Sequence, residues 1–376
     1  MLYKNADVFR EDGTFRHGSF TVENGRFAEI LDTVPDYEGV DLGGALVIPG
    51  LIDIHTHGNS GCDFSDGNYD EVATMLRYYA NNGITAVCPA SMTLPYDVLA
   101  HAYGTARRLH ENRPEGCARL AGINMEGPFF SYNKRGAQNP AHLRLPDVDA
   151  FARLNEVSGG IIAVADVAPE LEGAIPYIEK VSRTCTVSVA HTETDYDTAK
   201  AAFQAGATGL THLFNAQPGI HHRKPGPIAA GSENGNVYAE LISDGLHVHE
   251  SVIRMAFKLF PGRICIISDS LSCCGCPDGN YSLGGLPTIL KAGKCTLSDG
   301  ETLAGAVQNA YEGMCNCIRF GIPRGEAILA ATRNPAHQAG VLDELGTIAV
   351  GKRADFVVCG PDMTRRAVYM DGNRVC

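Results

Sequence analysis

The sequence predicts an α/β protein, a (β/α)8 barrel of the TIM type with a small β-sandwich domain formed from both chain termini. Two observations lead to this prediction. The middle of the chain alternates short apolar runs with amphipathic stretches, which is the pattern of parallel strands joined by helices. Both ends carry short strand-like segments separated by turn signals instead. The length of 376 residues suits one large barrel with a smaller appendage.

The small β domain is expected over residues 1–49 and 345–376. Its N-terminal part holds three dipeptides that favour tight turns: Asp12-Gly13, Asn24-Gly25 and Gly43-Gly44. Its C-terminal part holds three apolar segments that we predict as strands: Thr347–Val350, Ala354–Val358 and Val368–Met370. Because strands flank a helical middle at both ends, the two termini are expected to build one domain together.

The barrel is expected over residues 50–344. Eight apolar runs are predicted as its strands: Val47–Ile54, Ile84–Pro89, Leu120–Met125, Ile161–Val167, Thr186–Ala190, Ala207–Leu210, Tyr238–Ile242 and Ile264–Ile267. Amphipathic stretches between and after them are predicted as helices, among them Tyr69–Asn81, Tyr96–Glu111, Asp195–Ala205, Glu250–Leu259, Gly305–Phe320 and Arg324–Ala331. Eight strand–helix units favour a closed barrel over an open sheet.

Chemistry in such a barrel takes place where the strands end, so the residues that follow each run matter most. The first run leads into His55-Thr56-His57, and two residues two apart on a strand point to the same face. Other runs lead into Glu126, His191, His212, His247 and Asp269. Five runs therefore deliver a histidine or glutamate to one end of the barrel, and the last delivers an aspartate.

This residue set predicts a bound divalent transition metal. Imidazole and carboxylate groups suit zinc first, with iron, manganese or cobalt as alternatives. A single histidine is more often a hydrogen-bonded core residue, but independent structural histidines have no reason to follow successive strands. We expect Asp269 to be a base that faces the metal rather than a helix cap. No second cysteine pair with the spacing of a zinc site accompanies the Cys273–Cys276 cluster, so its cysteines are expected to be reduced thiols.

Composition excludes several partner classes. The formal net charge of −12 argues against a nucleic-acid or anionic-membrane surface. The sequence has no run of about 18 apolar residues, so no transmembrane helix is expected. Residues 1–10 include Lys4, Asp7 and Arg10 without an apolar segment, so no signal peptide is expected. Thirteen cysteines, several of them in apolar runs, favour reduced thiols and a cytoplasmic location.

Several motifs resemble the amidohydrolase superfamily and, within it, the N-acetylglucosamine-6-phosphate deacetylase family. The more specific ones are Pro49–Gly58, Asn124–Phe129, Thr211–Ala216, Asp244–His247, Asp278–Gly285, Thr302–Gly305 and Asn334–Ala336. Gly351–Asp355 is shared widely across amidohydrolases. The resemblance runs in order over nearly the whole chain. Many amidohydrolases use a lysine from strand four, whereas the fourth run here has none and the carboxylate comes from Glu126.

The resemblance implies deacetylation of N-acetylglucosamine 6-phosphate to glucosamine 6-phosphate and acetate. Hydroxide formed on the metal would attack the acetyl carbonyl, with Asp269 as general base and then acid. One or two ions per subunit are implied, the main ion held by Glu126, His191 and His212, and a second by His55 and His57 with Glu126 shared. The resemblance also places the substrate against Ala137, Gln138, Asn215, Ala216, Arg223, His247 and Leu303.

The resemblance further implies a homodimer in which Arg223 reaches the substrate phosphate of the partner subunit. One departure is Gln138, which follows Lys134–Ala137 where many members carry a histidine. Gln217 and Ala306 also depart from the usual residues. These departures leave the sugar epimer open, so an N-acetylgalactosamine-6-phosphate deacetylase is one alternative. Another amidohydrolase that acts on an N-acyl substrate is a second alternative. A scaffold protein without activity is disfavoured, because every ligand and Asp269 are present.

Overall fold

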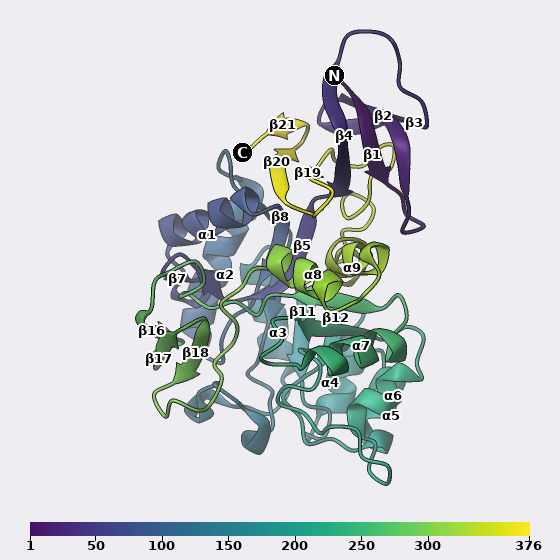
Figure 1. Ribbon diagram of the computed structural model, residues 1–376. Coiled ribbons are helices and arrows are strands. Elements are labelled where there is room, and N and C mark those ends of the chain that lie inside the picture. The colour runs from purple at the N-terminus through teal and green to yellow at the C-terminus, as the bar shows by residue number, and fades with distance from the viewer.

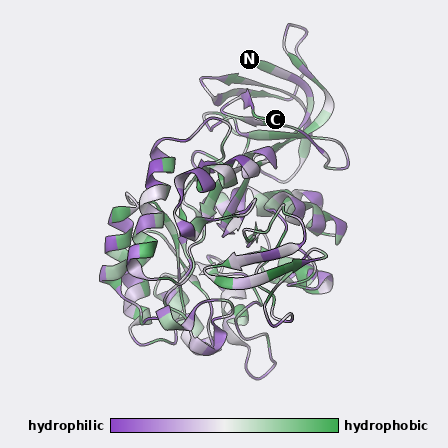
Figure 2. Cartoon of the chain, turned by 90° about the vertical axis from the view of Figure 1, so that its left-hand side faces the viewer, coloured by the Kyte–Doolittle hydropathy of each residue, from purple (hydrophilic) through white to green (hydrophobic).

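The computed structural model describes residues 1–376 and has a mixed α/β fold. Figure 1 shows a sheet built from both chain ends at one end of the molecule, and parallel strands with their helices in the rest. The hydropathy view shows helices with apolar and polar faces around these strands (Figure 2). No helix combines the length and hydropathy needed to cross a membrane.

The terminal sheet has seven strands in the order β21-β20-β19-β4-β1-β2-β3. They are β1 (Leu2–Phe9), β2 (Phe15–Glu23), β3 (Arg26–Leu31), β4 (Val40–Pro49), β19 (Phe356–Cys359), β20 (Arg365–Met370) and β21 (Asn373–Arg374). The N-terminal β4 pairs in parallel with β1 and antiparallel with the C-terminal β19. Tyr3, Phe20, Phe27 and Phe356 pack together as buried rings at its centre. The two ends of the chain therefore share one core.

The predicted strand at Thr347–Val350 is wrong, because this segment lies outside the strands. Gly346 and Gly351 flank it with φ values of 85° and 89°, a region that only glycine adopts readily. Ala349 accepts a hydrogen bond from the backbone of Lys352, so the segment closes a turn instead of joining the sheet. Ile348 packs in the core of the terminal sheet without strand pairing, whereas Val350 is exposed.

The strands of the larger part form two sheets with the orders β5-β8-β9 and β10-β11-β12-β13-β14-β15. All neighbours in these sheets are parallel. The strands are β5 (Leu51–Thr56), β8 (Ile84–Pro89), β9 (Arg119–Leu120), β10 (Ile123–Met125), β11 (Ile162–Val167), β12 (Thr186–Val189), β13 (Gly209–Leu210), β14 (Tyr238–Ile242) and β15 (Ile264–Ile267). Two short antiparallel sheets complete the fold, β6 (Gly58–Asn59) with β7 (Cys62–Asp63), and β16 (Gly279–Leu283) with β17 (Leu286–Lys291) and β18 (Lys294–Leu297).

The first predicted run, Val47–Ile54, covers two strands rather than one. β4 ends at Pro49 and β5 begins at Leu51, so the chain passes from the terminal sheet to the parallel strands at Gly50. A side chain at Gly50 would place its Cβ 2.2 Å from Thr85 Oγ1, and only glycine fits this passage. The run looked continuous because both strands are buried and apolar.

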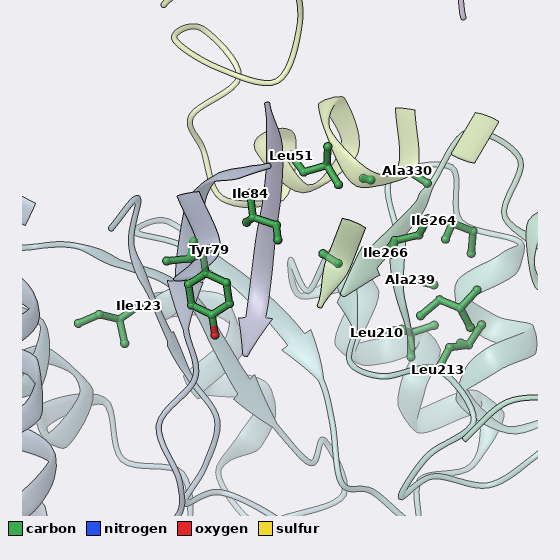
Figure 3. Close-up of a cluster of buried hydrophobic side chains, with 14 of the residues drawn as sticks. Leu51, Tyr79, Ile84, Ile123, Leu210, Leu213, Ala239, Ile264, Ile266 and Ala330 are labelled. Carbon is green, nitrogen blue, oxygen red and sulfur yellow. The ribbon is translucent and has the colours of Figure 1, made fainter. Parts of the chain in front are cut away.

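Ten α-helices accompany the strands, and most predicted helices match them closely. They are α1 (Tyr69–Asn81), α2 (Tyr96–Glu111), α3 (Val148–Val157), α4 (Ala174–Val181), α5 (Tyr196–Gln204), α6 (Gly226–Ser232), α7 (Glu250–Leu259), α8 (Ala310–Arg319), α9 (Arg324–Ala331) and α10 (Arg333–Gln338). Helix α8 begins later than the predicted Gly305, because Asn309 and Glu312 form a capping box that fixes its first turn. Figure 3 shows Leu51, Ile84 and Ile266 together with Ala330 of α9 in one cluster of buried side chains.

Candidate active site

Four histidine rings converge on the buried carboxylate of Glu126, the residue that follows β10. The Nε2 atoms of His191, His212 and His55 lie 3.1, 3.4 and 3.5 Å from its Oε1. His57 Nε2 lies 3.3 Å from its Oε2. Burial disfavours a charged carboxyl, yet the contacts with His55, His191 and His212 hold the pKa of Glu126 well below its usual value. The carboxylate is therefore an anion at the centre of the cluster.

These residues form two groups that fit a metal ion: Glu126 with His191 and His212, and Glu126 with His55 and His57. In each group the ligand atoms lie within 4.8 Å of one another. Two features support the fit. His191 Nε2 and His212 Nε2 lie 3.0 Å apart, and His55 Nε2 is buried without a hydrogen-bond partner. Imidazole nitrogens with a carboxylate oxygen are the donors that divalent transition metals take in proteins.

The hydrogen-bond partner of Nδ1 in each ring indicates which ring nitrogen can bind a metal ion. Three rings direct Nδ1 at a backbone carbonyl oxygen: His57 at Ala90 (3.2 Å), His191 at Lys134 (2.8 Å) and His212 at Asn215 (3.2 Å). A carbonyl oxygen only accepts, so Nδ1 carries a proton in each ring, and Nε2 is the nitrogen that can give its lone pair to a metal ion. His55 differs, because its Nδ1 lies 2.9 Å from a carboxylate oxygen of Glu240.

Three site residues share an unusual backbone. His191, His212 and Asp269 each lie two residues beyond the end of a strand, with φ values of 43°, 28° and 48°. This left-handed region costs a non-glycine residue on the order of 1–3 kcal/mol and is concentrated at functional sites. All three side chains line the same cavity. Sequence alternation alone does not predict this arrangement.

Asp269 faces the same cluster from the end of β15. Its Oδ1 lies 3.3 Å from His57 Nε2 and 3.8 Å from His55 Nε2. Burial raises the pKa of Asp269, but the hydrogen bond with His57 and the charges of nearby histidines outweigh burial, so the pKa is lowered overall. The side chain is thus an ionised carboxylate, which is the form that accepts a proton.

A cavity of about 180 Å³ opens above these groups. Eleven of the predicted site residues line it: His57, Glu126, Ala137, Gln138, His191, His212, Asn215, Ala216, His247, Asp269 and Leu303. His55 does not, because its ring is fully buried behind the cluster. Arg223 does not either. It is exposed, and its Nη1 contacts only His222 Nε2 at 2.7 Å. No lysine or arginine lines the cavity.

The predicted substrate residues take distinct positions around this cavity. Gln138 donates from Nε2 to Glu126 Oε2 over 2.7 Å. Burial opposes a charged ring at His247, but its hydrogen bond of 2.6 Å with Asp244 raises the pKa of His247 overall. Asn215 donates to the backbone carbonyls of His212 and Leu213. The cavity therefore combines acids, neutral amides and histidines, among which the pKa values of His57 and His247 are raised.

Sequence reasoning missed several residues of this site. Met92, Leu271 and Leu283 line the cavity as apolar walls, and their type gives no signal in the sequence. Glu240 carried a usable signal, because it is a charged residue inside the otherwise apolar run Tyr238–Ile242. Buried carboxylates are rare unless they are paired, so such an interruption of an apolar strand marks a polar contact.

The family follows from comparison with known proteins. The model of the amidohydrolase family matches residues 46–375. This chain belongs to the amidohydrolase family. Among curated relatives of this amidohydrolase, the N-acetylglucosamine-6-phosphate deacetylase of Vibrio furnissii is 32% identical over 357 residues, 94% of this chain and 89% of that protein. An N-acetylgalactosamine-6-phosphate deacetylase of Escherichia coli is 31% identical over 330 residues, 87% of each chain.

Solved structures of similar proteins agree with this placement. An aspartate-to-alanine variant of N-acetyl-D-glucosamine-6-phosphate deacetylase from Mycobacterium smegmatis, in complex with N-acetyl-D-glucosamine-6-phosphate, superposes with a TM-score of 0.93. It is 31% identical, with 100% of this amidohydrolase and 99% of that chain covered. The fold and the family are therefore the same along the whole chain.

Proposed function

We propose that this amidohydrolase hydrolyses the acetyl amide of N-acetylglucosamine 6-phosphate, giving glucosamine 6-phosphate and acetate. The observation that carries the proposal is that Asp269 faces the Glu126-centred histidine cluster across one cavity. An ionised acid beside a metal-binding group is the arrangement that amide hydrolysis requires. The deacetylase relatives of similar length support this choice of substrate.

In this proposal the main ion is held by Glu126, His191 and His212, and a second by His55, His57 and Glu126. A divalent ion, zinc in the first place, supplies a Lewis acid that activates water and polarises the acetyl carbonyl. Asp269 accepts the proton of the attacking water and passes it to the departing amine. The amide N–H of Gln138 donates to the acetyl oxygen as negative charge develops there.

The sugar phosphate is proposed to lie between His247, Asn215, Ala216 and Leu303 on the outer side of the cavity. The cavity contains no arginine or lysine of its own chain, while Arg223 is exposed outside it. A dianionic phosphate needs a cationic partner when it leaves water. We therefore infer a homodimer in which Arg223 of the partner subunit completes the site.

The frame we infer for this chemistry is a closed (β/α)8 barrel over residues 50–344, with a β sandwich from residues 1–49 and 345–376. Two contacts between the two parallel sheets support closure. Ala90 pairs in parallel with Asn124, and the backbone N–H of Asp269 donates to the carbonyl of His55 over 2.9 Å. A cytoplasmic location is proposed with it, because all thirteen cysteines are free.

A second candidate substrate is N-acetylgalactosamine 6-phosphate, which one relative of 31% identity is named for. The two sugars differ only in the orientation of one hydroxyl. The test is a deacetylation assay on both 6-phosphates and on unphosphorylated N-acetylglucosamine, with and without chelation and metal replacement. We expect metal-dependent release of acetate, fastest from N-acetylglucosamine 6-phosphate. Full activity in a metal-free sample, or no activity on either phosphate, would contradict the proposal.

A further inference from the structure

We propose that Glu240 is a positioning residue that orients and strengthens His55 as a metal ligand. Glu240 lies on β14 with its side chain buried, and its Oε2 is 2.9 Å from His55 Nδ1. His55 comes from β5, a different strand, so the contact arises only in the folded chain. The inference rests on the proposed metal-dependent function, in which His55 is a ligand of the second ion.

The partner of His55 differs in charge from those of the other three rings. The Nδ1 atoms of His57, His191 and His212 each meet a neutral backbone carbonyl, whereas that of His55 meets a carboxylate. Both partners hold the proton on Nδ1, but only the carboxylate adds a full negative charge. That charge makes the opposite nitrogen a better donor to a cation. Glu240 therefore does more for His55 than fix its tautomer.

The ring of His55 makes few polar contacts. It is fully buried, and its Nε2 has no hydrogen-bond partner. The nearest acids on that side are Glu126 and Asp269, at 3.5 and 3.8 Å. Glu240 is thus the one hydrogen-bonded contact of the His55 side chain, and it directs Nε2 at the group formed with His57 and Glu126.

The same Glu240 oxygen also accepts the backbone N–H of His212 over 3.3 Å. Glu240 therefore has a structural contact as well, with a ligand of the other group. Substitution by glutamine separates the two roles, because a glutamine oxygen can still accept from His55 and His212 while the charge is gone. A buried acid nearby, whose pKa burial raises well above its usual value, provides a control for substitution of a buried side chain. Asp166 on β11 accepts from Thr211 Oγ1 over 2.9 Å and has no hydrogen bond to a metal-ligand ring.

The experiment measures metal binding rather than turnover. Wild type, Glu240→Gln, Asp166→Asn, His55→Ala and the double variant His55→Ala/Glu240→Gln are titrated with Zn²⁺ against a chelator of known affinity. Wild type is expected to bind two ions. Glu240→Gln is expected to bind one of them about 10- to 100-fold more weakly, the usual effect of losing such a partner, and to keep the other. Asp166→Asn should match wild type.

The double variant decides whether Glu240 acts through His55. If it does, His55→Ala/Glu240→Gln binds zinc as His55→Ala alone does, because the ring that Glu240 prepares is already absent. An equal weakening in both backgrounds, or unchanged affinities in Glu240→Gln, overturns the inference. Wild type with only one ion also overturns it, while the proposed function stands. Turnover without any bound ion overturns the proposed function itself.

A second measurement needs no Glu240 variant and so remains if that variant does not fold. In the zinc-loaded wild type, a ¹H–¹⁵N spectrum of the histidine side chains detects the Nδ1 proton of each ring. His55→Ala assigns one signal by its loss. We expect this proton at lower field than those bonded to carbonyl oxygens, because it is bonded to a carboxylate. A His55 signal no lower than the other three, or none at all, overturns the inference.

Discussion

Gln138 lies between two fixed partners. Its amide nitrogen donates to Glu126 Oε2 and its amide oxygen accepts from the backbone N–H of Thr93, each over 2.7 Å. The backbone donor determines which end of the amide is oxygen, so the amino group must face Glu126. One amide hydrogen remains for the cavity, where an acetyl oxygen would lie.

Gln138→Ala is expected to lower kcat about 10- to 100-fold, because it removes a donor to the developing oxyanion. Gln138→His should retain more activity than Gln138→Ala, since histidine can also donate there. Steady-state kinetics with N-acetylglucosamine 6-phosphate measures both, and zinc content is the control for damage to Glu126. An unchanged kcat in Gln138→Ala would remove this residue from the mechanism.

Asp269→Asn should keep the bound metal and lose at least about 100-fold in kcat. The amide cannot accept the water proton, and a general acid–base group contributes about 10²–10⁴. Metal analysis and circular dichroism of the variant establish that only the proton acceptor has changed. Near-normal turnover in a folded, metal-loaded Asp269→Asn protein would assign the proton transfer elsewhere.

The two metal groups are expected to differ in importance. His212→Ala removes a ligand of the main ion and should abolish turnover together with that ion. His55→Ala should reduce turnover less, because it affects only the second group. Kinetics and metal content are measured on both variants. Equal losses in two folded proteins would reassign the main ion to His55, His57 and Glu126.

Arg223→Ala is expected to lower kcat/KM for the phosphorylated substrate by about 30-fold or more, since it removes a charged partner of the phosphate. Hydrolysis of the unphosphorylated sugar should hardly change. Lys224→Ala is the matched control, a cation in the same exposed turn without the planar guanidinium. Equal losses on both sugars would contradict a phosphate role.

Mixed dimers test whether Arg223 acts across the subunit interface. A dimer of one Arg223→Ala chain and one Asp269→Asn chain should recover one working site, which combines the intact aspartate of one chain with the intact arginine of the other. Each parent variant alone is the reference. Verified mixed dimers with no more activity than the parents would show that Arg223 does not act in trans.

Asp371 links the terminal sheet to the rest of the chain. Its carboxylate contacts Arg113 at 2.7 Å and Arg353 at 3.1 Å, and also contacts Arg119 of β9. Asp371→Asn is therefore expected to lower the free energy of unfolding by about 1–3 kcal/mol. Asp36→Asn, an exposed aspartate without an ion pair, is the control and should change stability little.

The effect of Asp371→Asn should depend on pH. Burial raises the pKa of Asp371, but the hydrogen bond with Arg119 and the charges of nearby arginines outweigh burial, so the pKa is lowered overall. A carboxyl with a lowered pKa in the folded state stabilises the protein above its ordinary pKa of about 4, and this contribution is lost as pH falls through the folded-state value. Urea unfolding should thus show the gap between variant and wild type narrowing below about pH 4. A constant gap would contradict an ionic role.

Much of the architecture could be predicted from sequence because local patterns determine it. Alternating apolar runs and amphipathic stretches placed most helices to within a residue or two, as with Tyr96–Glu111 and Arg324–Ala331. Errors arose where a local pattern had two outcomes. Thr347–Val350 is apolar as a strand would be, yet it closes a turn, and Val47–Ile54 hides a change of sheet at Gly50.

The sequence by itself determined which residue types stand at the ends of the strands, including Glu126, His191, His212 and Asp269. Only the tertiary structure decided how they meet. Left-handed turns redirect His191, His212 and Asp269, and parallel strands bring all four residues together from distant parts of the chain. Glu240 and His55 are in contact although 185 positions separate them in the sequence. Arg223 does not line the cavity, and this too is visible only in the folded chain. Distances of this kind depend on packing, which local periodicity does not encode.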